Sequence, residues 1–182
     1  MHEAFIEYRD RETTLEGFAA HQGDGKKPAV LVFHAWRGRD DFSCDAARKL
    51  AEMGYVGFAA DVYGKGVSGT SKEECTALMS PFVEDRAHLR ERLLAAYNVV
   101  KNLDYVDSSR IATIGYCFGG LCSLDLARSG ADLKAAISFH GLLMGLPPEV
   151  ASKDINAKIL VCHGYQDPQV PYEQVSDFEK EM

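Results

Sequence analysis

Residues 110–120 read RIATIGYCFGG, and this stretch decides the fold. Its first half is a short apolar run, too short for a helix, and it predicts a buried strand. The second half, Gly115 to Gly120, has the pattern Gly-x-Cys-x-Gly-Gly, and a helical pattern follows it up to Gly130. A strand that turns sharply into a helix needs small residues on both sides of the turn. We therefore predict a strand–turn–helix unit that exposes the side chain of Cys117 above a sheet.

Further apolar runs of similar length flank this unit and alternate with amphipathic helical patterns. These runs lie at residues 29–33, 55–61, 134–139 and 158–163. The helices are expected over residues 42–53, 81–103, 118–129 and 172–182. Ser80-Pro81 is the predicted start of the second helix, since proline suits the first helical position. The alternation predicts an α/β fold with a doubly wound, mostly parallel sheet, and we assign residues 1–182 to one domain.

The N-terminal segment has a different pattern. Residues 5–8 and 13–20 are separated by the polar run 9–12, which predicts an antiparallel strand pair joined by a turn. Two longer connections are expected at residues 64–70 and 141–154. Long loops in compact domains often carry functional residues.

Composition and charge exclude several classes of protein. Hydrophobic residues make up 46% of the 182 residues and charged residues 26%, which allows one sizeable core and excludes a disordered chain. The net charge of −7 argues against nucleic acid as a partner, and no apolar run has the length of a membrane helix. The five cysteines form no CxxC pair, and the charged N-terminus lacks the apolar core of a signal peptide. We therefore expect a reduced, cytoplasmic protein.

Cys117 is the candidate nucleophile. It stands at the N-terminus of the predicted helix, where the helix dipole lowers the pKa of a thiol. The backbone N–H of Phe118, the next residue, can donate a hydrogen bond to a developing oxyanion. The alternative is a buried structural cysteine in a glycine-rich turn, because unpaired cysteines are often buried.

Two other strand ends are expected at the same edge of the sheet. The run 158–163 leads into HGYQDPQVP, in which Asp167 can orient an imidazole; a turn-forming role is its alternative. His163 is interpreted as a packing residue beneath that turn. The first apolar run leads into HAWRG at residues 34–38, and the N–H of Trp36 is the candidate for a second oxyanion donor. Trp36 as a mere wall of the pocket is the alternative.

The segments HAWRG, AADVYGKG, DSSRIATIGYCFGG, SFHG and HGYQDPQVP together resemble the dienelactone hydrolase family, and the resemblance covers nearly the whole chain. It implies an α/β-hydrolase fold and a carboxymethylenebutenolidase-like hydrolase of small esters or lactones. It also implies a Cys–His–Asp triad with a thioester intermediate, in which Cys117 is the nucleophile and Asp167 the acid. Family substrates often carry a carboxylate that an arginine binds. Candidate substrate-binding residues are Arg37, Arg39, Arg86, Tyr63 and Tyr116.

Two features depart from that family. Its catalytic histidine follows the acid, after one more helix and strand, whereas residues 168–182 contain no histidine. We therefore expect a C-terminally incomplete domain that lacks the last strand and helix, with no triad histidine in this sequence. Ala35 stands about where the family has a glutamate that holds the resting thiol. This difference favours direct attack assisted by a histidine over activation by that glutamate.

Two other functions remain open on these residues. Without the histidine, Cys117 could be a redox-responsive thiol in a non-hydrolytic protein, or the pocket could bind a ligand without turnover. For the hydrolase we expect a small ester or lactone as the substrate. We expect no cofactor and no metal, because no cluster of histidines, cysteines and acids has the spacing of metal ligands. The chain is expected to be a monomer or a homodimer.

Overall fold

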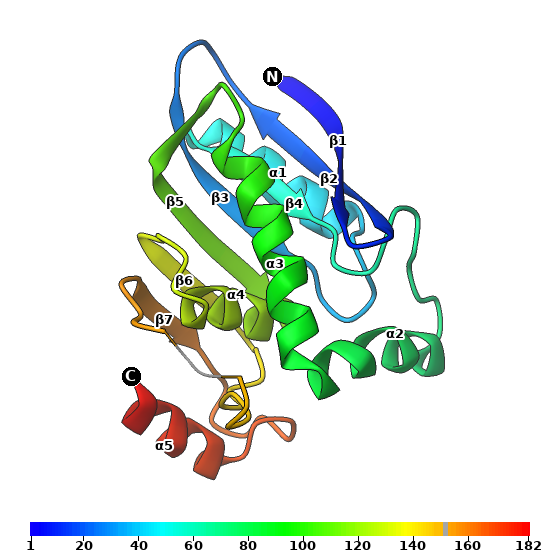
Figure 1. The fold of residues 1–182 in the computed structure, drawn as a ribbon, viewed down its shortest axis with the longest axis vertical. Helices are drawn as coiled ribbons and strands as arrows, with labels where there is room; N and C mark the ends of the chain where they lie inside the picture. The colour runs from blue at the N-terminus through cyan, green and yellow to red at the C-terminus, as the bar shows by residue number, and fades with distance from the viewer. Residues whose placement is uncertain (151–152) are drawn as a thin grey trace.

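The computed structural model of the chain describes residues 1–150 and 153–182, and there seven strands form one sheet (Figure 1). The strands are β1 (His2–Asp10), β2 (Thr13–His21), β3 (Lys27–Phe33), β4 (Val56–Ala60), β5 (Val106–Tyr116), β6 (Ala135–Phe139) and β7 (Lys158–Cys162). Their order across the sheet is β1-β2-β4-β3-β5-β6-β7. All five apolar runs form strands, as predicted, because runs of this length suit strands of a parallel sheet. β7 is the edge strand, and its residues are exposed or half-buried.

The sheet combines an antiparallel pair with a parallel array. β1 and β2 pair antiparallel, as predicted, and β2 then pairs antiparallel with β4. From β4 onward, β3, β5, β6 and β7 pair in parallel with their neighbours. The predicted α/β-hydrolase-type, mostly parallel sheet is therefore confirmed. Since parallel strands end at one edge, the loops after β3, β5, β6 and β7 meet there.

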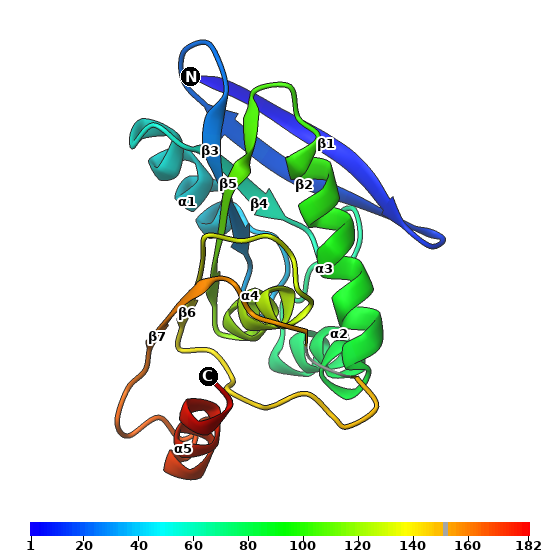
Figure 2. The same cartoon turned by 60° about the vertical axis from the view of Figure 1, so that its left-hand side comes forward.

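Helices lie on both faces of the sheet. They are α1 (Asp41–Glu52), α2 (Lys72–Glu84), α3 (Arg86–Lys101), α4 (Phe118–Arg128) and α5 (Tyr172–Glu181). α1 contacts β2, β3 and β4 on one face, whereas α3 and α4 lie on the opposite face (Figure 2). Among residues 1–150 and 153–182, no helix has both the length and the apolar character needed to cross a bilayer.

The predicted start of the second helix at Ser80-Pro81 is wrong. α2 begins earlier, because Ser71 and Glu74 form a capping box: each side chain accepts from the other residue's backbone N–H. Pro81 lies inside α2, near its end. The helix then stops at Asp85, whose side chain accepts from the N–H of His88 and so starts α3. One predicted helix is therefore two, and the break comes where Asp85 caps α3.

The core forms mainly between the central strands and α3. Leu89, Leu93, Tyr97 and Val100 of α3 are all buried in this core. The connection 64–70 is irregular, as predicted. The connection 141–154 is irregular in its described part, and residues 151–152 lie outside the described residues.

Candidate active site

Cys117 occupies a strained turn between β5 and α4. Its backbone has φ 55° and ψ −118°, a left-handed conformation that L-residues other than glycine rarely adopt. The flanking glycines are required by space: a Cβ at Gly115 would lie 1.8 Å from the carbonyl oxygen of Gly119, and one at Gly119 would lie 2.2 Å from that of Phe33. The predicted strand–turn–helix unit thus forms. Because Gly115 and Gly119 have no side chain, β5 can turn directly into α4.

The backbone N–H groups of Phe118 and Trp36, the two residues predicted as oxyanion donors, both act on the Cys117 thiol and lower its pKa. Burial acts in the opposite direction and is the larger effect, so the pKa of Cys117 is raised above its usual value. The sequence predicts a lowered pKa for this thiol at the helix terminus, and that prediction is wrong, because burial outweighs the effects that lower the pKa. The resting sulfur at neutral pH is a thiol rather than a thiolate.

Asp167 lies on the loop after β7, and its partner is His140, which sequence reasoning missed. The Nδ1 of His140 pairs with Oδ2 of Asp167, and the N–H of Gln169 donates to Oδ1 at 2.9 Å. The Gln169 N–H is the main cause of a lowered pKa at Asp167, with His140 adding to it. Only 4% of the Asp167 side chain is exposed, whereas 52% of that of His140 is. The pair therefore joins a sheltered carboxylate to an accessible imidazole.

The position of His140 explains both its pairing and the omission. It directly follows β6, the neighbour of β7, and its backbone N–H donates to the carbonyl of Cys162 at 2.9 Å. His140 precedes Asp167 in the chain, whereas the family resemblance implies a histidine that follows the acid. The signal that could have found His140 was its place at the end of a predicted strand. Parallel neighbours bring such residues to the same edge as Asp167.

His163 lies on the other side of the same carboxylate. Its Nδ1 is 4.0 Å from Oδ2 of Asp167, beyond hydrogen-bond distance, and its side chain is only 15% exposed. Asp167 is therefore hydrogen-bonded to the imidazole of His140, whereas the imidazole of His163 lies near it without a hydrogen bond.

A cavity of about 460 Å³ opens beside Cys117. It is lined by Ala35, Trp36, Met79, Cys117, Phe118, His140, Leu142 and Gln169. Most of these side chains are apolar, and none carries a fixed charge. The candidate nucleophile, both N–H donors and His140 therefore share one apolar hollow.

The predicted substrate-binding arginines lie elsewhere. Arg86 is buried and makes a bidentate ion pair with Asp125, with N–O distances of 2.6 and 2.5 Å. Arg39 pairs with Glu16 at 2.9 Å, and Nε of Arg37 donates to a backbone carbonyl. None of the three lines the cavity beside Cys117. The assignment of Arg86 to substrate is corrected, because its guanidinium is enclosed with Asp125.

The two predicted tyrosines also lie outside the lining of this cavity. Tyr63 is buried, and its hydroxyl donates to the carbonyl of Trp36 at 2.9 Å. Tyr116 stacks on Phe139, with 5.1 Å between the ring centroids, and faces α1 instead. Tyr63 therefore supports the loop that bears a donor rather than forming the pocket wall.

Replacing Arg86 with methionine is expected to destabilise the fold by about 3 kcal/mol, because Asp125 loses one of its two buried cationic partners and the carbonyl of Met144 loses a donor. Urea unfolding measures this loss. Arg110→Met, which removes an exposed pair with Asp107, is the matched control and should hardly move the midpoint. The structural role would be contradicted if the Arg86 variant kept the urea midpoint of the parent and showed a raised KM for carboxylate-bearing esters.

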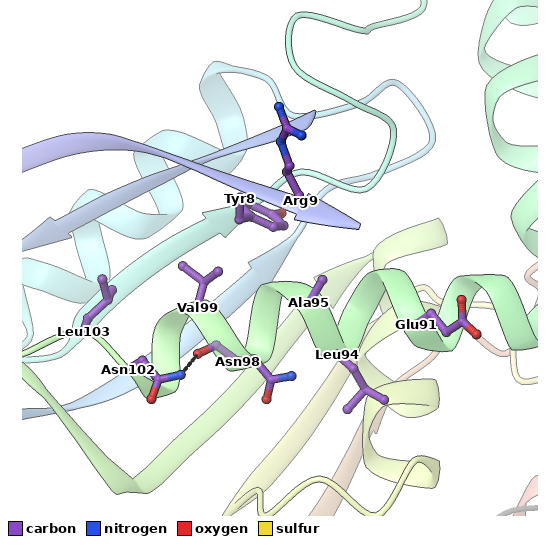
Figure 3. Close-up of a pocket in the computed structure, with 9 residues that line it drawn as sticks. All are labelled: Tyr8, Arg9, Glu91, Leu94, Ala95, Asn98, Val99, Asn102 and Leu103. Carbon is purple, nitrogen blue, oxygen red and sulfur yellow. Dashed lines mark hydrogen bonds between the residues drawn. The ribbon is translucent and has the colours of Figure 1, made fainter. Parts of the chain in front are cut away.

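A larger hollow lies far from this chemistry. It has a volume of about 730 Å³ and lies between β1 and α3, where Tyr8 and Val99 face each other (Figure 3). Asn102 there donates to the backbone carbonyl of Asn98 at 2.8 Å. Its lining contains neither cysteine nor histidine. Size alone therefore does not select the candidate site; the cavity beside Cys117 is the candidate because Cys117, Trp36, Phe118 and His140 line it together.

The sheet order and the cysteine on its strained turn define an α/β-hydrolase fold. The chain belongs to the dienelactone hydrolase family, whose sequence model matches residues 15–182. It is 28% identical over 178 residues to a putative carboxymethylenebutenolidase of Escherichia coli K12, a match that covers 88% of this chain and 62% of that protein.

Two solved structures are also similar. One, named m3DLH, has a TM-score of 0.92 and 37% identity, covering 99% of this chain and 75% of that one. The other is a dienelactone hydrolase-like promiscuous phosphotriesterase, P91, from metagenomic libraries, with a TM-score of 0.89 and 35% identity, covering 99% and 77%. The chain spans about 60% of the length of the first curated relatives it matches.

Proposed function

We propose that the protein hydrolyses small esters or lactones, with Cys117 as the nucleophile. One observation carries this proposal: Cys117, the residues of the two N–H groups that act on its thiol, and an Asp167-bound imidazole line one cavity. Membership of the dienelactone hydrolase family and the name of the Escherichia coli relative support the reaction class. In this proposal the substrate is a small molecule, and the chemistry requires no cofactor.

The reaction needs a base, because the resting sulfur holds its proton. His140 is the base in this proposal. Asp167 is a carboxylate and accepts the Nδ1–H of His140, so Nε2 is left with a free lone pair. That nitrogen takes the thiol proton as sulfur attacks the carbonyl carbon. The N–H groups of Phe118 and Trp36, no longer bound to the sulfur, then stabilise the oxyanion.

The second half of the reaction restores the thiol. The imidazolium gives its proton to the leaving alkoxide, the C–O bond breaks, and a thioester to Cys117 remains. Water then attacks the thioester while the imidazole takes one of its protons. The C–S bond breaks, the carboxylic acid leaves, and the sulfur recovers its proton. For a lactone the alcohol stays on the same molecule as the acid.

The raised pKa of Cys117 argues against the redox-sensor alternative. A sensor thiol reacts with peroxide as the thiolate, which a low pKa favours. Burial holds the Cys117 proton in place instead. Without a base to remove that proton, the sulfur would react slowly, so the surroundings suit base-assisted attack on a carbonyl.

Acyl-enzyme trapping tests the proposal. The protein is mixed with p-nitrophenyl acetate, acidified within the first turnover, digested and analysed by mass spectrometry. An acetyl group on the peptide that contains Cys117 is expected. Turnover that proceeds without this acetyl group would overturn a covalent mechanism at Cys117. Acetylation of the Cys162 peptide alone would point to non-specific reaction with an exposed thiol.

The apolar lining favours substrates with an uncharged acyl group. We expect p-nitrophenyl butyrate to exceed mono-p-nitrophenyl succinate in kcat/KM by at least about tenfold, because an unpaired carboxylate is costly in an apolar hollow. Met79→Lys, which adds a cation to the lining, should narrow that ratio, and Met79→Leu is its uncharged control. Preference for the succinate ester in the unsubstituted protein would contradict this choice of substrate.

A further inference from the structure

His34 is a buried histidine next to the site, and both of its ring nitrogens are engaged. It follows β3 and is only 1% exposed. Its Nδ1 lies 2.6 Å from the carbonyl oxygen of Ala35, and its Nε2 lies 3.2 Å from the backbone nitrogen of Val62. The Val62 N–H can only donate, so Nε2 accepts and Nδ1 carries the hydrogen. His34 is therefore neutral and held in one tautomer, and its burial lowers its pKa in agreement.

The carbonyl that His34 binds belongs to the peptide group that bears the Trp36 N–H. A peptide group is planar, and this one is trans, so its C=O and N–H point in opposite directions. Fixing the oxygen of Ala35 thus fixes the direction of the Trp36 N–H, and Trp36 lines the same cavity as Cys117. The Trp36 N–H also lowers the pKa of the Cys117 thiol. A hydrogen bond to the oxygen also polarises the group and strengthens the N–H as a donor.

Neighbouring contacts link His34 to Trp36 and Phe118, the residues of the two N–H groups. Its ring packs edge-on against that of Tyr63, with 4.9 Å between the ring centroids, and the Tyr63 hydroxyl donates to the carbonyl of Trp36. Its ring also lies 6.3 Å from that of Phe118, the residue that supplies the other N–H. Through Val62 it joins the β3 loop to the loop after β4. The loop that bears Trp36 is therefore held by two side chains: His34, which follows β3, and Tyr63, which follows β4.

We propose that His34 is a positioning residue that orients the Ala35–Trp36 peptide toward the oxyanion. This inference rests on the proposed function, because it assigns a role in stabilising the oxyanion of that reaction. His34 does not touch the substrate, and it acts through the backbone of Trp36. Its effect should therefore appear in kcat more than in KM.

Two amide substitutions separate the roles of the two ring nitrogens. The amide nitrogen of asparagine can stand near the place of Nδ1, whereas the longer glutamine amide reaches toward that of Nε2. His34→Gln should therefore lower kcat by about 10- to 100-fold and leave KM nearly unchanged. This loss is smaller than the loss in kcat expected when an oxyanion donor is deleted. His34→Asn should recover most of that loss. Equal losses in both variants, or a loss confined to KM, would overturn the positioning role.

Two measurements keep this test independent of folding and of the proposed function. ¹⁵N NMR of the unsubstituted protein should show His34 protonated on Nδ1, and an Nε2–H tautomer would overturn the inference whether or not the variants fold. Alkylation of Cys117 by iodoacetamide forms no oxyanion, so at a pH high enough to ionise the thiol fully its rate in His34→Gln should stay close to that of the parent. If the unsubstituted protein shows no Cys117-dependent turnover, the proposed function has failed, while the tautomer still reports on His34.

Discussion

Cys117→Ala is expected to abolish ester hydrolysis, lowering kcat for p-nitrophenyl acetate by at least about 10³-fold. The reason is that the alanine cannot form the thioester, although the N–H groups of Phe118 and Trp36 remain. The measurement is steady-state release of p-nitrophenol. The fold should persist, since a methyl group fits wherever the cysteine Cβ already lies. Retention of most of the parent rate would place the chemistry on another residue.

Cys162→Ala is the matched control for that substitution. Cys162 is an exposed thiol at the end of β7, and it lines no part of the hollow beside Cys117. Its loss should leave kcat unchanged. A parallel drop in both variants would indicate that turnover comes from the reactivity of thiols in general.

The pH dependence of alkylation separates the hydrolase from the redox-sensor alternative. Because burial raises the pKa of Cys117, iodoacetamide should react faster with rising pH until well past about 8.5, the ordinary thiol pKa. The rate of alkylation follows the thiolate fraction, which increases as pH passes through the thiol pKa. A plateau already reached at neutral pH would reveal a stable thiolate and favour the sensor.

The fold could be predicted because its signals are local. Each buried strand is a short apolar run, and the turn at Cys117 is marked by glycines whose Cβ would collide with backbone oxygens. The split between α2 and α3 was missed because the capping box at Ser71 competes with an attractive start at Ser80-Pro81. Both signals are local, and the stronger cap determines where the helix begins.

The site could be predicted only in part, because its remaining members depend on contacts between distant segments. Phe118 and Trp36 could be predicted from their places after predicted strands, and both act to lower the pKa of the Cys117 thiol. Arg86 looked available for substrate because its partner, Asp125, lies on another helix and is distant in sequence. His140 and Asp167 come from different strand ends, and only the parallel pairing of β6 with β7 brings them together.

Asp167→Asn and His140→Gln should each lower kcat by about 10²- to 10⁴-fold, the range for loss of a general base or of the group that orients it. An asparagine cannot hold the Nδ1–H tautomer of His140 by charge, and a glutamine cannot take the thiol proton. The double variant should be little worse than either single one, because residues that act as a unit are not additive. Steady-state kinetics of the three variants test this coupling.

His163→Gln is the matched control, since His163 lies near the same carboxylate without a hydrogen bond to it. It should keep most of the parent kcat. If His140→Gln keeps its kcat while Asp167→Asn loses it, the imidazole that Asp167 serves is a different one, and His140 is not the base. If instead His140→Gln loses kcat while its Cys117 still alkylates at the parent rate at high pH, the base is His140. High pH makes the thiolate without help, so the substitution then affects only the step in which a proton must be taken.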